Sequence, residues 1–521
     1  MIKKEASIFI IVGLLTVAID FLVYRCLVWG LEFDINLAKA EGFLAGTVFS
    51  YFANKYWTFR HKEHKQGSLW RFAPLYGLTL VVNIYVNSLV LAVLSNSEKA
   101  TLVAFISATG LSAFLNFIGM KYFVFRAENK GPLMKVGVKA SRVGIIYDIE
   151  ILRAIAILFV VYGHLAALFP WVGGNEIYHY MVEHFAFWGG VDLFLVISGF
   201  VIMRTLSAQL AVDMTKGDFW KVIISFWVRR VFRIFPSAWL WLIIIPICSV
   251  IFNQTGDFKT FWPNFADMVA GMLNIANFHH YQQMQGTVAW GANSVYWSLS
   301  LEEQFYLLLP LLIFVTKKYL PYSLVLLILI QVFIPREQGS LMWEMRFDGL
   351  LLGVLLARIS TMPIYSLIEP TILQDKKVAR IFLVFMLIML ASIASPLLKI
   401  VPFYTGVLAI LAVILVWVAS YDRSYISLPR LLKPIFLWIG SRSFTIYLIH
   451  TPCFHATREI WYRFSPEKYP FDSAYTWLFG LTATFLITVI AELNYRYLEV
   501  PVREYGKRVA WKIKSSSKEA F

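Results

Sequence analysis

The chain has 521 residues, of which 59% are apolar, 17% are aromatic and only 15% are charged. Soluble domains carry about 25% charged residues, so this composition excludes a soluble enzyme and a disordered chain and predicts an all-α polytopic membrane protein. The formal net charge of +15 is scattered between apolar runs, which argues against a nucleic-acid partner. The three cysteines lie far apart, so we expect neither a metal site nor a disulfide framework.

Fourteen membrane spans are predicted, because a helix needs about 20 apolar residues to cross a bilayer. Residues 1–127 form a first domain of four spans, 128–147 a cytoplasmic linker, 148–508 a second domain of ten spans, and 509–521 a basic tail. The expected spans are 8–30, 37–58, 70–94, 101–124, 149–170, 187–207, 231–252, 295–316, 319–335, 341–358, 380–397, 402–420, 435–456 and 474–498. The short apolar segment 265–278 is interpreted as interfacial or re-entrant.

The orientation follows from the bias of lysine and arginine toward cytoplasmic loops. With both termini inside, the inner loops hold most of the basic residues, among them Lys62, Lys130, Lys317 and Lys376. The opposite orientation would reverse the bias. We therefore predict cytoplasmic N and C termini and a multi-pass location in the cell inner (plasma) membrane.

An internal repeat marks the first domain. Ala53–Arg60 reads AlaAsnLysTyrTrpThrPheArg, and Gly119–Arg126 reads GlyMetLysTyrPheValPheArg, 66 residues later. Each copy follows the second span of a hairpin, which predicts two parallel hairpins. An aromatic belt with basic anchors accounts for the motif, and so does a site for a lipid phosphate. The lipid-phosphate candidates are Asp20, Lys55, Arg60, Lys121 and Arg126.

Asp20 stands inside the first span, where a carboxylate is costly. It marks a functional site or pairs with Asn83 as packing, and the sequence leaves both readings open. Four spans with AsnLysTyrTrpThrPheArg after the second resemble the GtrA-like family over about residues 5–127. That resemblance implies a role in moving polyprenyl-phosphate-linked sugars across the membrane.

The fifth span begins with an arginine and a histidine 11 residues apart. At about 100° per residue, Arg153 and His164 share one helix face and lie about 16 Å apart along the axis. Arg153 is then near the cytoplasmic edge, and His164 lies beyond the midplane. A lone histidine in a span is often a packing residue, whereas one aligned with an arginine indicates a polar path.

Further polar groups occur within or next to the later spans. Arg229, Arg230 and Arg233 are expected in a cytoplasmic loop, where guanidinium groups suit a diphosphate or merely anchor the chain. Carboxylates and basic groups also occur at span mouths. These are Asp192 at an outer helix end, Glu302 and Glu303 at an outer mouth, Arg346 and Asp348 in an outer half, and His450 within GlySerArgSerPheThrIleTyrLeuIleHis.

This series resembles, over roughly residues 145–508, the acyltransferase-3 family of membrane acyltransferases. The resemblance implies transfer of an acyl group, usually acetyl from cytoplasmic acetyl-CoA, to a sugar hydroxyl of a surface polysaccharide or lipid-linked glycan, without a metal. Some members carry a soluble esterase-like domain after the membrane part. After Glu499 only a basic tail follows here, so the membrane domain completes the reaction alone or a separate glycan-processing protein does.

The resemblance assigns roles that acyl-transfer chemistry requires. His164 is expected to be the base or a transient acyl carrier, and Arg153 to hold the thioester or stabilise negative charge. The cluster Arg229, Arg230 and Arg233 would grip the phosphates of acetyl-CoA. Asp192 and Glu302 or Glu303 would position the acceptor or tune the imidazole, and Arg346, Asp348 and His450 would bind substrate.

Two rival hypotheses remain from the sequence. In one, the chain is a flippase or transporter of polyprenyl-linked sugar whose second domain is not catalytic. In the other, the first domain only docks or supports the second. The expected partners in the main hypothesis are membrane lipid and a glycan or polyprenyl-linked sugar acceptor.

Overall fold

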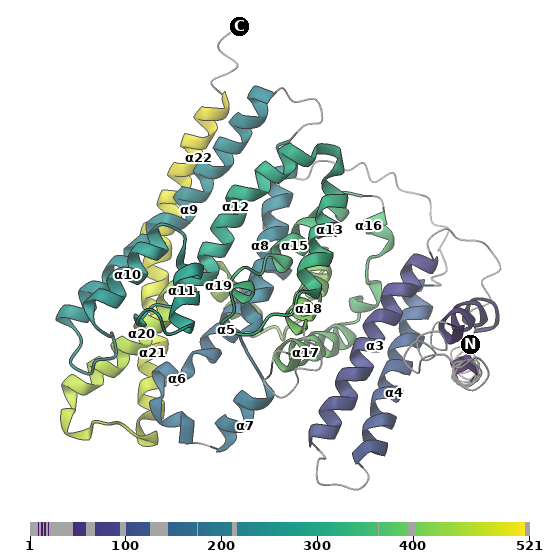
Figure 1. The fold of residues 1–521 in the computed structure, drawn as a ribbon, viewed down its shortest axis with the longest axis horizontal. Coiled ribbons are helices and arrows are strands. Elements are labelled where there is room, and N and C mark those ends of the chain that lie inside the picture. Colours follow the sequence, from purple (N-terminus) through teal and green to yellow (C-terminus); the bar gives the residue numbers. More distant parts are fainter. Residues whose placement is uncertain are drawn as a thin grey trace. The chain divides into compact units, whose positions relative to one another are not determined.

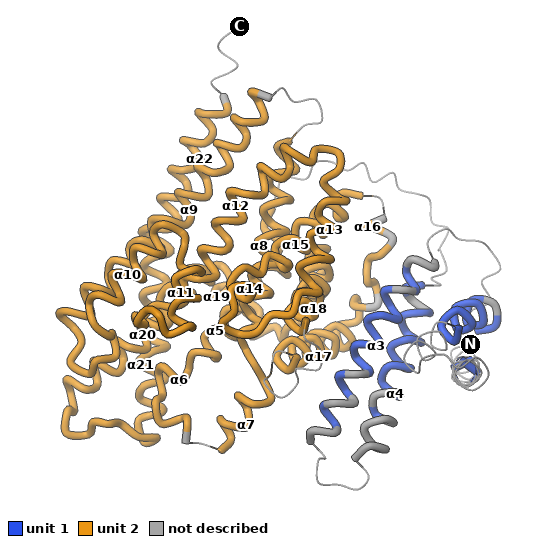
Figure 2. The backbone as a smooth tube through the Cα atoms, in the orientation of Figure 1, with its two compact units in different colours: residues 1–137 blue, residues 138–521 orange. Residues whose placement is uncertain are grey.

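The computed structural model describes most of the second domain and part of the first. The described residues are 45–58, 68–93, 100–124, 144–174, 176–210, 216–362, 364–393, 395 and 403–515, with isolated positions between 9 and 19. These residues form helices and connecting turns and no strand. The chain divides into two compact units, residues 1–137 and 138–521 (Figure 2).

The first unit is built around two long antiparallel helices, α3 (Ser68–Val93) and α4 (Ala100–Gly119), which pack along each other. Two short π-helices lie at the repeat: η1 (Asn54–Thr58) and η2 (Met120–Val124). They begin and end at equivalent positions of the two copies, so the repeated motif specifies the same local backbone twice. The span predicted at 8–30 is described only at isolated positions.

Polar side chains join the helices of this unit. The Thr79 hydroxyl donates to Asn116 Oδ1 at 2.9 Å, and Asn83 Nδ2 donates to Ser112 Oγ at 2.9 Å. Asn83 therefore has a partner on α4, while Asp20, its expected partner, lies outside the described residues. Such interhelical bonds hold apolar helices in register.

The second unit is a bundle of long helices linked by short ones (Figure 1). Its longer helices are α5 (Tyr147–Gly163), α7 (Glu176–His184), α8 (Gly189–Ser207), α9 (Lys216–Ile251), α10 (Phe261–Met272), α11 (Ala276–Met284), α12 (Tyr296–Thr316), α13 (Leu320–Phe333), α15 (Asp348–Ile359), α17 (Lys376–Ile393), α18 (Tyr404–Ala419), α19 (Lys433–Ser441), α20 (Ser443–Phe464), α21 (Thr476–Asn494) and α22 (Val500–Ser515).

Short elements connect them: α6 (Leu165–Leu168), η3 (Pro170–Gly174), η4 (Lys317–Tyr319), α14 (Leu341–Glu344), α16 (Ile364–Leu367), η5 (Thr371–Gln374), η7 (Pro466–Lys468), η8 (Ser473–Tyr475) and the π-helix η9 (Tyr495–Glu499). In the described part of the chain, four stretches are long and apolar enough to cross a membrane: Gly189–Ser207, Gly217–Ile251, Tyr296–Phe333 and Ser473–Lys514. The expected total of fourteen spans stays a prediction.

Several local expectations are wrong. The spans expected at 149–170 and 341–358 are each divided, the first after Gly163 and the second between Glu344 and Asp348. The stretch containing Arg229 and Arg233 is not a loop, because it lies within the 36-residue helix α9, whose first proline comes only at Pro236. The segment 435–456 is not one continuous helix either. It breaks at Arg442, whose φ of −107° and ψ of 6° separate α19 from α20.

The core of the unit is the contact between α8 and α15, which is the most extensive between any two of the described helices. Gly199 of α8 faces the backbone of Leu350, and a Cβ there would lie 2.1 Å from the Leu350 carbonyl oxygen. Gly353 of α15 faces α8 in the same way, since its Cβ would lie 2.2 Å from the carbonyl oxygen of Val196. Small residues thus let the two backbones touch, as in many membrane helix pairs.

Candidate active site

A cavity of about 630 Å³ enters the second unit between α5, α8, α9, α12, α20 and η9. It is lined by the first residues of α5, the last turns of α8 and the start of α22, which sequence analysis assigns to the cytoplasmic side. Its size is within the range of pockets that bind organic cofactors.

Positive charge dominates this cavity. Its ionisable lining residues are Arg153, Arg204, Arg229, Arg230, Arg233, Arg503 and Lys507 on the basic side and Glu150, Glu302 and Glu499 on the acidic side. An excess of guanidinium groups in a partly enclosed space attracts and orients polyanions such as phosphates. The three arginines of the sequence motif, expected to act together, do line one cavity.

The arginines of α9 differ in their surroundings. Arg229 Nη1 donates to Ser225 Oγ and Nη2 donates to Gln209 Oε1, both at 2.8 Å. The Arg230 guanidinium lies over the ring of Tyr306, 5.3 Å from its centroid. Arg229 is therefore anchored to the protein, and Arg230 is held by cation–π attraction that leaves donors for a ligand.

Glu302 shares the cavity with the arginines. It was expected at an outer mouth, and it lines the same cavity as Arg153 and the arginines of α9, where it accepts a hydrogen bond from the Ser198 hydroxyl of α8. Glu303, the next residue, faces away from the cavity lining and is 6% exposed.

Arg153 and His164 are both on α5 but in different settings. Arg153 lines the cavity, and its Nη1 donates to Glu150 Oε1 at 2.7 Å. The helix ends at Gly163, and His164 follows with φ −103° and ψ 7°. The helix thus ends one residue before the histidine, and His164 does not line the cavity that Arg153 lines.

His164 pairs with His450 of α20, whose Nε2 lies 3.3 Å from His164 Nδ1. His164 Nδ1 is also 2.8 Å from the Val160 carbonyl oxygen, and His450 Nδ1 is 2.8 Å from that of Tyr447. Because a carbonyl oxygen only accepts, each neutral ring carries its proton on Nδ1. The lone pair of His164 is then on Nε2, where a base or nucleophile needs it.

Tyr447 separates this histidine pair from the cavity. In the described part of the chain, the residues that line the cavity include Tyr447 but neither His164 nor His450. The Tyr447 hydroxyl donates to the Val295 carbonyl at 2.7 Å and lies 2.6 Å from Ser298 Oγ. The arginine cluster and the histidines therefore occupy two compartments.

Two buried ion pairs lie at the other ends of α8 and α15. Arg346 Nε lies 3.3 Å from Asp192 Oδ1, and Arg336 Nη1 donates to Asp348 Oδ2 at 2.8 Å. The Arg346 guanidinium also packs against the ring of Trp343, 4.3 Å from the ring centroid. Each of these two buried carboxyl groups thus lies beside an arginine, as buried ionisable groups require, and the sequence did not reveal Arg336 as a partner.

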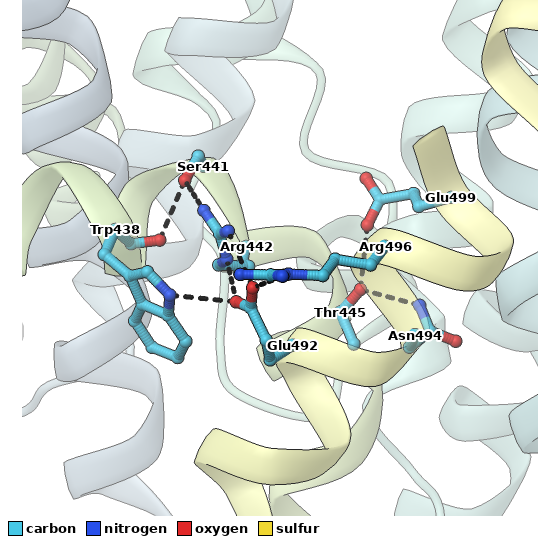
Figure 3. A network of polar contacts seen from close by, with 8 residues as sticks. All are labelled: Trp438, Ser441, Arg442, Thr445, Glu492, Asn494, Arg496 and Glu499. Carbon is cyan, nitrogen blue, oxygen red and sulfur yellow. Dashed lines mark hydrogen bonds and ion pairs between the residues drawn. The ribbon is translucent and has the colours of Figure 1, made fainter. Parts of the chain in front are cut away.

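A polar network supports the wall of the cavity at α21 and η9 (Figure 3). Glu492 accepts hydrogen bonds from Arg442 Nε at 2.8 Å, from Trp438 Nε1 at 2.9 Å and from Arg496. The Thr445 hydroxyl donates to Glu499 Oε2 at 2.8 Å, which places Glu499 against the cavity. These hydrogen bonds hold the break between α19 and α20 against the π-helix η9.

Comparison with known proteins identifies both units. Residues 146–493 match the family model described as an acyltransferase domain, and 8–125 match that of the GtrA/DPMS transmembrane domain. The chain belongs to the acyltransferase-3 family. Its acyltransferase domain follows a GtrA-like domain, so the fusion expected from the motifs is confirmed.

The acyltransferase domain is similar to curated bacterial proteins. It is 28% identical over 382 residues to "Peptidoglycan O-acetyltransferase OatA" of Listeria monocytogenes, covering 69% of this chain and 56% of that protein. It is 26% identical to "Putative peptidoglycan O-acetyltransferase YrhL" of Bacillus subtilis (68% and 55%) and 25% identical to "O-acetyltransferase OatA" of Staphylococcus aureus (68% and 57%). The match spans about half the length of these relatives. No solved structure matches the chain.

The candidates in the GtrA-like domain are only partly described. Lys55 lies in η1 and is 5% exposed. Lys121 lies in η2, but its side chain is outside the described part, as are Asp20, Arg60 and Arg126. The lipid-phosphate site therefore stays a prediction.

Several residues of the acyltransferase cavity escaped the sequence reading. Tyr447 and Glu150 lie beside motif residues but carry no signal of their own, because only the tertiary fold brings their helices together. Ser198 stands next to Gly199 in ValIleSerGlyPhe, and a pair of small residues of this kind is typical of close helix packing. The structure divides that pair, since Gly199 packs on α15 and Ser198 faces the cavity.

Proposed function

We propose that the chain is an O-acetyltransferase that carries acetyl from acetyl-CoA on the cytoplasmic side to a sugar hydroxyl of a surface glycan. The arginine-rich cavity carries the proposal, because coenzyme A presents a diphosphate and a 3′-phosphate that such a cavity would bind. The names of the relatives, which are O-acetyltransferases and in part act on peptidoglycan, support acetyl as the group and a glycan as the acceptor.

Different groups of cavity and histidine residues would carry out different parts of the reaction. Arg229, Arg230 and Arg233 would bind the donor phosphates, and Arg153 would face the thioester end. His164 would take the proton of the sugar hydroxyl on Nε2 and return it. The ion pair of Asp192 with Arg346, which precedes α15, would shape the acceptor side.

The GtrA-like domain would supply the acceptor. In this proposal, Lys55, Arg60, Lys121 and Arg126 bind the phosphate of a polyprenyl-linked sugar in the inner membrane, and the sugar is then acetylated. Adjacency in one chain supports the link. In the same proposal, a separate glycan-processing protein would complete maturation of the product.

Purified chain in lipid vesicles tests the donor. With acetyl-CoA, the variant with Arg229, Arg230 and Arg233 all replaced by alanine should show a KM raised by at least about tenfold, since a hydrogen bond to a charged group contributes about 1.5–3 kcal/mol. A matched variant, Lys377→Ala with Arg380→Ala on α17, should behave like wild type. A fall in kcat alone would contradict phosphate binding.

The base is tested separately. His164→Ala should abolish sugar acetylation while the protein remains folded by size-exclusion chromatography. Transfer at the wild-type rate would refute the assignment. A chain that moves lipid-linked sugar but never consumes acetyl-CoA would instead support a transporter.

A further inference from the structure

The donor cavity and His164 lie in separate compartments, which raises the question of which group receives the acetyl first. The cavity lining includes the hydroxyl groups of Ser198, Ser298 and Tyr447. Ser298 and Tyr447 bond to each other, and Tyr447 also bonds to a backbone carbonyl. Of these three hydroxyls, Ser198 is the one whose partner is a carboxylate, Glu302.

The position of Ser198 follows from the faces of α8. Phe194, Ser198, Val201 and Thr205 line the cavity, at the spacing of one helix face. Gly199, one residue on, lies on the face that packs against α15. Helix packing therefore accounts for Gly199 and leaves Ser198 without a packing role.

The surroundings of this hydroxyl resemble those of an activated nucleophile. Its hydrogen goes to Glu302 Oε1, so a base is already in contact. A smaller space of about 40 Å³ adjoins the pair and is lined by Arg153, Arg230 and Arg233 as well. Cations in this position would stabilise the negative charge that develops on a carbonyl oxygen under attack.

We infer that Ser198 is acetylated by the donor and carries the acetyl group as an ester. The Ser198 oxygen forms the new bond to the carbonyl carbon, and its proton passes to the Glu302 carboxylate. The carbon–sulfur bond then breaks, and the departing thiolate takes the proton from Glu302. The products are acetyl-Ser198 and coenzyme A, without any oxidant, reductant or further reactant.

A second transfer completes the cycle and rests on the proposed function. A sugar hydroxyl gives its proton to His164 and attacks the Ser198 ester, and the departing Ser198 oxygen then takes that proton from His164. The path from Ser198 to the histidines passes Tyr447, which must turn aside. The covalent carrier explains how one acetyl group can pass from the donor cavity to the histidines, which are not among the residues that line it.

Acid-quenched labelling tests the inference. Purified full-length chain receives acetyl-CoA labelled in the acetyl group, without acceptor, and the bound label is located by mass spectrometry. We expect about one acetyl per chain on the peptide containing Ser198, released by hydroxylamine as an ester. Ser198→Ala should lose it, and Ser198→Cys should retain it as a thioester. Glu302→Gln should slow labelling by about 10²–10⁴-fold.

Controls separate the outcomes. Ser207→Ala, on the same helix but outside the cavity lining, should label like wild type. Tight binding of coenzyme A by Ser198→Ala would show that this variant is folded. Acetylation of sugar at the wild-type rate by Ser198→Ala, or label on His164 only, would overturn the serine carrier and leave the acetyltransferase function intact. A wild-type chain that never reacts with acetyl-CoA would overturn both.

Discussion

Gly199→Ala tests how closely α8 and α15 must approach. The added Cβ would lie 2.1 Å from the Leu350 carbonyl oxygen, whereas ordinary contact begins at about 3.4 Å. One helix must therefore shift by about 1.3 Å, since a backbone carbonyl cannot rotate away as a flexible side chain can. Overpacking of this kind costs about 1–3 kcal/mol of stability. Because the Leu350 carbonyl is held in a helix, we expect a cost near the upper end of that range.

A shift of α8 would also move Ser198, the residue next to Gly199. Ser198 should lose its alignment with Glu302, and misplacement of a reacting group by about 1 Å can cost about 10²-fold in rate. We expect Gly199→Ala to unfold at a lower temperature in detergent and to consume acetyl-CoA about 10²-fold more slowly. Thermal unfolding and initial rates of coenzyme A release measure the two effects.

Gly480→Ala on α21 is the matched control. A Cβ there would lie 3.8 Å from the ring of Phe169, which is ordinary contact, so only the gain in helix propensity of about 1 kcal/mol remains. This variant should be as stable as wild type or more so. Equal unfolding temperatures and rates for the two alanine variants would refute the steric reasoning.

Three further predictions follow from the charges. Arg346→Met should destabilise the protein by about 3–5 kcal/mol because it leaves Asp192 buried and unpaired, and adding Asp192→Leu should restore much of that stability in thermal unfolding. His450→Leu should lower kcat and leave the KM for acetyl-CoA unchanged, because His450 lies outside the donor cavity; a raised KM would contradict the two compartments. Salt should raise the KM for acetyl-CoA but not for uncharged acetyl-pantetheine, as electrostatic screening requires, and a flat salt profile would contradict the role of the arginines.

Much of the architecture was predictable from local sequence. The helices α3, α8, α12 and α18 lie within a few residues of the expected spans, because apolar runs of this length form helices wherever they are placed. The sequence repeat also specifies local structure, because its two copies form π-helices at equivalent positions. The motifs indicated the acyltransferase family, which the family comparison confirmed.

The assembly of the site depended on contacts between distant segments. Arg229 and Arg233 were correctly grouped, since residues four apart share a helix face, but their place within a long helix was missed. Glu302 was placed at an outer mouth from its position in an expected span, and hydropathy does not show which side chains of other helices a residue meets. The tertiary fold decided that Glu302 meets Ser198, that His164 meets His450 and that Tyr447 stands between.

The sequence by itself determined a membrane chain of helices whose scarce polar groups within the spans mark its chemistry, because burying such groups is costly. Only the tertiary structure decided which of these groups meet. Partners such as Ser198 and Glu302 are 104 residues apart, and their meeting depends on helix packing that no local pattern records. That packing converts scattered polar residues into a donor cavity and a separate histidine pair.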